Sequence, residues 1–218
     1  MIVAIDGPAG CGKSTVARLV ADELGFYFLN TGSFYRAVTY AHIMRGGDCH
    51  DRDSCLETAR NTHISVVDGD ICIDGIDIED KLHTRDVDMN ASIVSSDPRL
   101  REIVTDEVRK VAGSMDIVTE GRDTTTVIFP DAQCKFYFDA SAEIRATRRV
   151  EQQGEGQSYE EVLDLIRRRD ENDRNKEVGA LRIAEDAVYI DTSHLTIREV
   201  CEKVVSVVRS VIDGRAAK

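Results

Sequence analysis

The first 24 residues constrain the fold more than any other part of the sequence. A short apolar run, MIVAI (1–5), is followed by a glycine-rich turn and by a helical pattern from Lys13 to Leu24, which Gly25 ends. The turn, GPAGCGKST (7–15), matches G-x-x-x-x-G-K-[ST] and lies between a predicted buried strand and a predicted helix. This is the context of a phosphate-binding loop, so an α/β fold that binds a nucleoside triphosphate is expected.

The residue types in this loop suit phosphate binding. Glycines allow successive backbone N–H groups to point inward, and the start of the following helix adds positive potential at the same place. Lys13 can reach the outer phosphates, and the Ser14 hydroxyl can be a ligand of Mg²⁺. The triphosphate is therefore expected to contact Gly7, Pro8, Ala9, Gly10, Cys11, Gly12, Lys13, Ser14 and Thr15.

Strand and helix patterns alternate along the rest of the chain, which predicts a five-stranded parallel sheet flanked by helices. Besides residues 1–5, strands are expected at 26–29, 116–120, 135–140 and 187–191. Helices are expected at 33–45, from Pro98 to near Gly113, and after the capping boxes Ser158-x-x-Glu161 and Thr196-x-x-Glu199. The last helix carries one apolar stripe, formed by Ile197, Val200, Cys201, Val204, Val205 and Val208.

One segment interrupts this alternation. Residues 62–78 alternate apolar and polar side chains, and Asp68-Gly69 and Asp74-Gly75 are typical hairpin turns. An antiparallel hairpin does not suit a βα alternation. The segment is therefore interpreted as part of a small inserted β subdomain, at about 48–96.

Composition excludes some partners. The chain has 28 Lys and Arg against 40 Asp and Glu, a net charge of −12, which argues against binding a nucleic-acid polymer. The six cysteines show no CxxC or zinc-type spacing, and no apolar run is long enough to span a membrane. The first residues lack a basic region followed by a long apolar run, so we expect no signal peptide. We expect a cytoplasmic monomer that acts on small molecules.

A phosphate-binding loop alone leaves the reaction open. A guanine-specific switch needs N-K-x-D, whereas Asn175-Lys176 is followed by Glu177-Val178, and a motor ATPase needs a longer chain. A small kinase needs a second phosphate site. Arg36 and Arg122-Asp123 follow predicted strands, at the sheet edge where ligands bind in open α/β folds.

The segment RRRDENDRNK (167–176) has two interpretations. It is either a cationic arm that closes over phosphates, or an exposed helix with i, i+4 ion pairs such as Arg169–Asp173.

Four segments together carry a resemblance to a known family. IVAIDGPAGCGKST, TGSFYRA, GRDTTTVIFPDA and RDENDRNK, with YIDT in the last strand, resemble bacterial cytidylate kinases over nearly the whole chain. The resemblance implies a P-loop kinase that uses ATP and Mg²⁺ to phosphorylate CMP and dCMP. It also implies a core at 1–47, 97–150 and 177–218, a nucleoside-monophosphate-binding insert at about 48–96 and a helical lid at about 151–176.

The resemblance further implies roles for individual residues. Gly7 to Thr15 would hold ATP, and the catalytic residues would be Lys13, Arg122, Asp123 and Arg169, with Ser14 on the metal. The CMP phosphate would be held by Thr31, Arg36 and Arg122, and the cytosine by Ser92, Arg101 and Asp123. Arg169 and Asp173 would reach the ribose or the transferring group, and Lys176 would also bind CMP.

The sequence departs from the family pattern at a few positions. Lys176 stands where arginine is usual, Asn30 where aspartate is usual, and Thr125 where glycine is usual, while Gly179-Ala180 replaces Ala-Pro. Two alternatives remain open at this level: another small P-loop kinase, acting on shikimate or a nucleoside, and a nucleotide-binding regulatory module without catalysis.

Overall fold

The computed structural model describes residues 1–67, 70–113, 115–153 and 158–216. The chain divides into two compact units. The first comprises Met1–Leu29 and Met115–Lys218, and the second comprises Asn30–Ser114.

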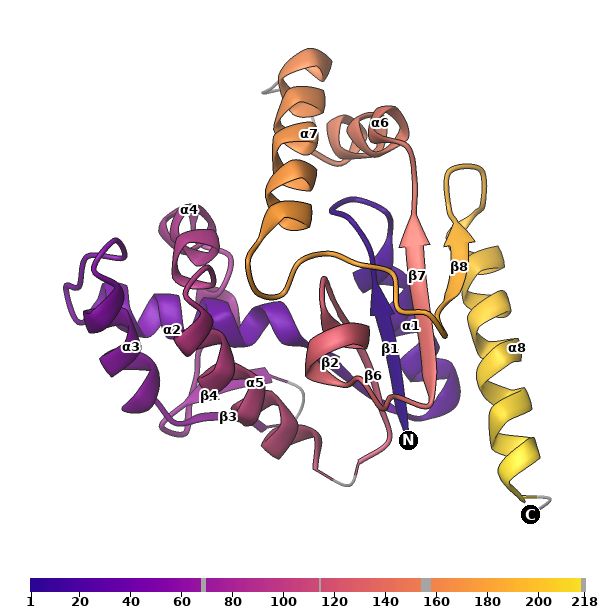
Figure 1. The fold of residues 1–218 in the computed structure, drawn as a ribbon, viewed down its shortest axis with the longest axis horizontal. Coiled ribbons are helices and arrows are strands. Elements are labelled where there is room, and N and C mark those ends of the chain that lie inside the picture. The colour runs from indigo at the N-terminus through magenta and orange to yellow at the C-terminus, as the bar shows by residue number, and fades with distance from the viewer. Residues whose placement is uncertain (68–69, 114, 154–157, 217–218) are drawn as a thin grey trace. The chain divides into compact units, whose positions relative to one another are not determined.

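The first unit contains the predicted five-stranded parallel sheet, in the order β2-β6-β1-β7-β8 (Figure 1). Its strands are β1 (Ile2–Asp6), β2 (Tyr27–Asn30), β6 (Ile117–Gly121), β7 (Cys134–Asp139) and β8 (Val188–Asp191). In the parallel register, Asp6 lies opposite Gly121 of β6 and Tyr137 of β7. The carboxyl ends of the three central strands therefore come together where the phosphate-binding loop begins.

Two helices form the main core of this unit with the sheet. α1 (Lys13–Leu24) has the predicted bounds, and Gly25 ends it with a φ of 67°. α8 (Ile197–Ala216) packs against α1 and β7. Its apolar stripe is buried in the core, together with Val3, Ile5, Phe136 and Phe138, except for Ile197, which is exposed.

Two further helices of the first unit pack against each other. They are α6 (Ala142–Gln153) and α7 (Tyr159–Asn175), which share a small core of Ala146, Val162 and Ile166. The predicted capping box is present, since Ser158 and Glu161 bond each other's backbone N–H groups. Within the described residues, no helix combines the length and the apolar character needed to cross a membrane.

The second unit contains the predicted antiparallel piece, a three-stranded sheet in the order β3-β4-β5. Asp74 and Gly75 take positive φ angles of 51° and 81°, which forms the second predicted turn. The other predicted turn, Asp68-Gly69, lies outside the described residues. The strands are β3 (Ile64–Val67), β4 (Asp70–Ile73) and β5 (Ile76–Asp77).

Helices make up most of the second unit. They are α2 (Thr31–Met44), α3 (Arg52–Arg60), η1 (Glu79–Lys81), α4 (Arg85–Val94) and α5 (Pro98–Ala112). The start of α2 was predicted at Ser33, which is wrong by two residues, since the helix begins at Thr31. The Asn30 side chain accepts a hydrogen bond from Gly32 N and caps α2 at Thr31, a task that asparagine performs as well as the usual aspartate.

Candidate active site

The phosphate-binding loop joins β1 to α1, as the sequence predicts. A side chain at Gly7 would put its Cβ 2.0 Å from the carbonyl oxygen of Phe138, so only glycine fits there. Gly10 and Gly12 have φ angles of 81° and 91°, which turn the chain into the helix. The loop is therefore shaped by its glycines before any ligand contributes.

Lys13 and Cys11 point into this loop. Lys13 is only 5% exposed, and its ammonium donates a hydrogen bond of 2.8 Å to the carbonyl oxygen of Pro8. The buried thiol of Cys11 donates to the same oxygen at 3.1 Å. Burial lowers the pKa of Lys13, and the positive charge of Arg122 lowers it further. The protein therefore buries a positive charge that its surroundings disfavour, which suits a site that binds a highly charged anion.

The Ser14 hydroxyl faces a carboxylate that sequence reasoning missed. It donates a hydrogen bond of 2.9 Å to Glu120 Oε1, and Glu120 is nearly buried on β6. The signal was available, because Glu120 ends a predicted strand at the carboxyl edge of the sheet. A hydroxyl beside a carboxylate provides the oxygen ligands that Mg²⁺ prefers, so the residues present fit a magnesium ion.

A second missed carboxylate, Asp6, ties the end of β1 to the turn after β6. Its oxygens accept hydrogen bonds from Thr124 N at 2.9 Å, Thr125 N at 2.7 Å and Thr125 Oγ1 at 2.6 Å. Complete burial raises the pKa of Asp6, although these hydrogen bonds oppose the shift. The threonine that replaces a usual glycine thus supplies a hydroxyl for a buried acid. It also anchors η2 (Thr124–Ile128), the π-helical turn that directly follows Asp123.

This arrangement predicts a stability effect at Thr125. Replacing it by valine keeps the shape but removes the hydroxyl, and the free energy of unfolding should fall by about 1 to 3 kcal/mol, measured in urea. The matched control is Thr126→Val. Thr126 Oγ1 is buried without a hydrogen-bond partner among the described residues, so that substitution should be neutral or stabilising. Equal losses in both variants would contradict the assigned role of Thr125.

Three of the predicted site residues form a cluster in the first unit. Arg122 Nε donates to Asp173 Oδ2 at 2.8 Å, and Lys176 Nζ lies 3.0 Å from Asp173 Oδ1. Burial by itself would raise the pKa of Asp173, but Arg122 and Lys176 outweigh it, and the net pKa is lowered. Asp123 is buried at the start of η2, and Arg169 is exposed on α7.

Four predicted residues belong to the second unit. Arg36 of α2 donates to the carbonyl oxygen of Leu82 at 2.9 Å and forms an ion pair with Asp88 of α4, the helix that also carries Ser92. The guanidinium of Arg101, on α5, lies 5.0 Å from the ring centre of Tyr35, on α2. Thr31 is the buried first residue of α2.

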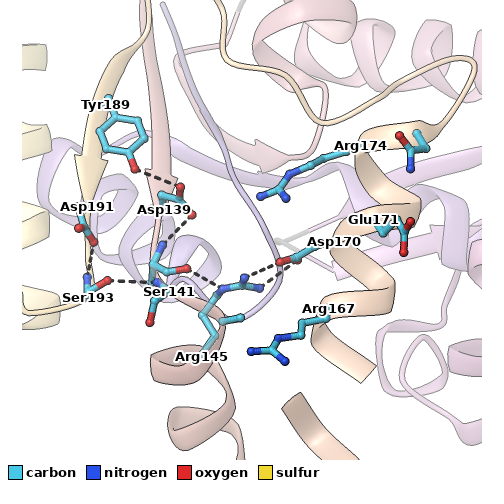
Figure 2. A pocket seen from close by; sticks show the side chains of 13 residues that line it. Asp139, Ser141, Arg145, Arg167, Asp170, Glu171, Arg174, Tyr189, Asp191 and Ser193 are labelled. Carbon is cyan, nitrogen blue, oxygen red and sulfur yellow. Dashed lines mark hydrogen bonds and ion pairs between the residues drawn. The ribbon is translucent and has the colours of Figure 1, made fainter. Parts of the chain in front are cut away.

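A pocket of about 550 Å³ lies in the first unit, close to the phosphate-binding loop (Figure 2). Figure 2 shows Arg167 and Arg174 extending from α7 toward the side of β7 and β8. Tyr189 donates from its hydroxyl to Asp139 at 3.1 Å, and its ring stacks on Tyr137. The lining residues are Asp139, Ala140, Ser141, Ala142, Arg145, Arg167, Asp170, Glu171, Arg174, Asn175, Tyr189, Asp191 and Ser193. An aromatic face beside several cations is suited to a nucleotide.

Comparison with known proteins gives a consistent result. The family model described as cytidylate kinase matches residues 3–210. The cytidylate kinase of Rhodopirellula baltica is 43% identical over 220 residues, covering 100% of this chain and 96% of that protein. That of Caldanaerobacter subterraneus subsp. tengcongensis is 40% identical, covering 97% and 96%. An uncharacterized protein from Eubacterium ventriosum, of known structure, has a similar fold, with a TM-score of 0.53 at 13% identity over 96% of this chain and 99% of its own.

Proposed function

Because this chain belongs to the cytidylate kinase family, we propose that it transfers the γ-phosphoryl group of ATP to CMP and to dCMP. The observation that carries the proposal is the family match over nearly the whole chain, on a fold that has a complete phosphate-binding loop. The alternatives of a shikimate kinase and of a non-catalytic module are not favoured by the relatives' names.

We assign the donor nucleotide to the first unit. The backbone N–H groups of the phosphate-binding loop and the ammonium of Lys13 would hold its phosphates. The pocket that Arg145 connects to Ala9 of this loop would take its nucleoside part. Ser14 and Glu120 would hold Mg²⁺, which, when bound, neutralises charge on the β- and γ-phosphate oxygens.

The residues proposed to bind the acceptor are assigned within each unit separately. In the second unit, Thr31 and Arg36 would bind the CMP phosphate, and Ser92 and Arg101 the cytosine. In the first unit, Arg122 would bind phosphate, because a guanidinium can donate to two oxygens at once. Asp123 would contact the base, and Asp173 and Lys176 would lie at the ribose and the transferring group.

The proposed chemistry needs no covalent intermediate and no general base, because an oxygen of the CMP phosphate is already a nucleophile. The protein has to hold the two phosphates in line and stabilise the charge of the transferring group. Lys13, Arg122 and Arg169 are the cations assigned to this task. The lid, about 151–176, would exclude water, which otherwise competes as acceptor.

A coupled assay of ADP release with each nucleoside monophosphate in turn tests the proposal. CMP and dCMP should support turnover well above UMP and AMP. Phosphorylation of shikimate or of a nucleoside without transfer to CMP would overturn it. Tight ATP binding without transfer to any acceptor would favour the regulatory module.

Arg169→Ala should lower kcat by roughly 100-fold or more, because an arginine on the transferring group stabilises charge that develops in the transition state. The matched control is Arg168→Ala. Arg168 is the neighbouring arginine, and it forms only an exposed ion pair with Asp164 of the same helix among the contacts described for it. It should leave kcat close to that of the unchanged enzyme. A loss at Arg169 that is confined to KM would reassign this residue to substrate binding.

We further propose that the protein works as a monomer in the cytoplasm. All six cysteines are free buried thiols, which suits a reducing compartment. Sedimentation at micromolar concentration checks the oligomeric state.

A further inference from the structure

Arg145 joins three segments of the first unit that are far apart in the sequence. Only 2% of it is exposed, and its guanidinium donates to the carbonyl oxygen of Ala140 at the end of β7 and to that of Ala9 in the phosphate-binding loop, at 2.9 and 3.1 Å. Its Nη1 also donates to Asp170 of α7, and together with Nη2 it forms a bidentate ion pair with that carboxylate (Figure 2). One side chain therefore connects the sheet, the loop and the proposed lid helix.

The geometry of this contact is restrictive. A guanidinium is planar and rigid. Because two backbone oxygens already hold that of Arg145, the Asp170 carboxylate must lie in the same plane and approach from one direction to accept both hydrogen bonds. The loop also approaches closely, since a Cβ at Gly10 would lie 3.4 Å from Arg145 Cβ. A buried ion pair of this kind contributes little net stability, because desolvating two charges offsets their attraction. Its effect is to select one placement of α7 against the phosphate-binding loop.

The selected placement carries two further arginines with it. Arg169 directly precedes Asp170, and Arg174 follows one turn later on the same helix. We propose that Arg145 is a positioning residue, which holds α7 on the phosphate-binding loop through Asp170 and so sets where Arg169 acts on the transferring group. This inference rests on the proposed function for its kinetic consequence, but the contact itself can be tested without turnover.

The kinetic test uses Arg145→Met, alone and combined with Arg169→Ala. Alone, it should lower kcat with CMP by about 100-fold and change the KM for CMP by less than about threefold, because a small displacement of a catalytic group slows the chemical step. In the Arg169→Ala background, Arg145→Met should lower kcat by less than about threefold, because both substitutions remove the same contribution of Arg169. A full loss in both backgrounds would overturn the proposal, as would unchanged kcat in the single variant.

Controls separate positioning from general damage. Glu143→Gln breaks the exposed ion pair with Arg167, which joins the same two helices, α6 and α7, and it should leave kcat unchanged. If Arg145→Met does not fold, Arg145→Lys keeps the charge but loses the planar fork and should show a smaller fall in kcat with the same dependence on Arg169.

Hydrogen exchange of the ATP-bound enzyme provides the second readout. Amides of α7 should exchange faster in Arg145→Met than in the unchanged protein or in Glu143→Gln. Faster exchange in an enzyme that never phosphorylates CMP would reject the proposed function and keep the structural contact. Unchanged exchange with normal CMP turnover would reject the contact and keep the function.

Discussion

Lys13→Met should lower kcat with CMP on the order of 1000-fold while leaving the free energy of unfolding unchanged or higher. The kinetic loss follows from removing the cation assigned to the transferring phosphoryl group. The stability result follows from the lowered pKa of Lys13, which means that the folded protein holds this proton less tightly than the unfolded chain does. The charge is therefore a cost to folding at neutral pH, and methionine removes it from the same buried space.

Unfolding in urea and steady-state assays on the same preparations check this prediction. The difference in stability between variant and unchanged protein should shrink as pH rises from the lowered pKa of Lys13 toward the ordinary lysine pKa. Above the ordinary lysine pKa it should disappear, because the lysine is then neutral in both the folded and the unfolded chain. A marked loss of stability in Lys13→Met would show that its bond to the Pro8 carbonyl outweighs the burial of its charge.

Arg122→Met should lower kcat/KM for CMP by an amount on the order of 1000-fold and, unlike the change at Lys13, should destabilise the fold. Asp173 is nearly buried, and without Arg122 it keeps only the ammonium of Lys176 among the partners described for it. Leaving a buried carboxylate partly compensated should cost on the order of 2 kcal/mol in the free energy of unfolding.

The double variant Arg122→Met with Asp173→Asn isolates this cause. It should recover part of the lost stability, because the uncompensated charge is gone, but not the lost kcat/KM. Without Arg122, burial should raise the pKa of Asp173 above its value in the unchanged protein. The stability difference between Arg122→Met and the unchanged protein should therefore shrink as pH falls from that raised pKa toward the lowered pKa of the unchanged protein, because protonation removes the buried charge. A stability loss that the double variant does not reduce would contradict the ion-pair explanation.

Several elements could be predicted because their signals are local. The strand, glycine turn and helix of residues 1–25 depend on apolar runs, positive φ angles and helix caps, which act between residues close in sequence. The same holds for the Ser158–Glu161 box and for the turn at Asp74-Gly75. The helices α3, α4 and α6 were not predicted, because helices of 9 to 12 residues give few repeats of the apolar pattern.

The residues of the candidate site also divide into those with a local sequence signal and those without one. Recurrent motifs indicated Lys13, Ser14, Arg122 and Asp173, whose chemistry and order along the chain are visible in the sequence. Asp6, Glu120 and Arg145 were missed. Their importance comes from partners 119, 106 and 25 positions away, which local patterns do not identify. For Glu120, its place at the end of a predicted strand indicated the sheet edge but not the partner Ser14.

The segment RRRDENDRNK shows what each level of information decides. The sequence by itself determined that a helix rich in arginines and acids follows a capping box, and that the fold is a P-loop α/β fold. Only the tertiary structure decided that Asp170 pairs with Arg145 and Asp173 with Arg122. The pair of Arg168 with Asp164, four positions apart on α7, is of the local kind that the sequence can indicate. Propensity and periodicity act over a few residues, whereas the partner of a buried charge depends on which side chains the packed elements bring into reach.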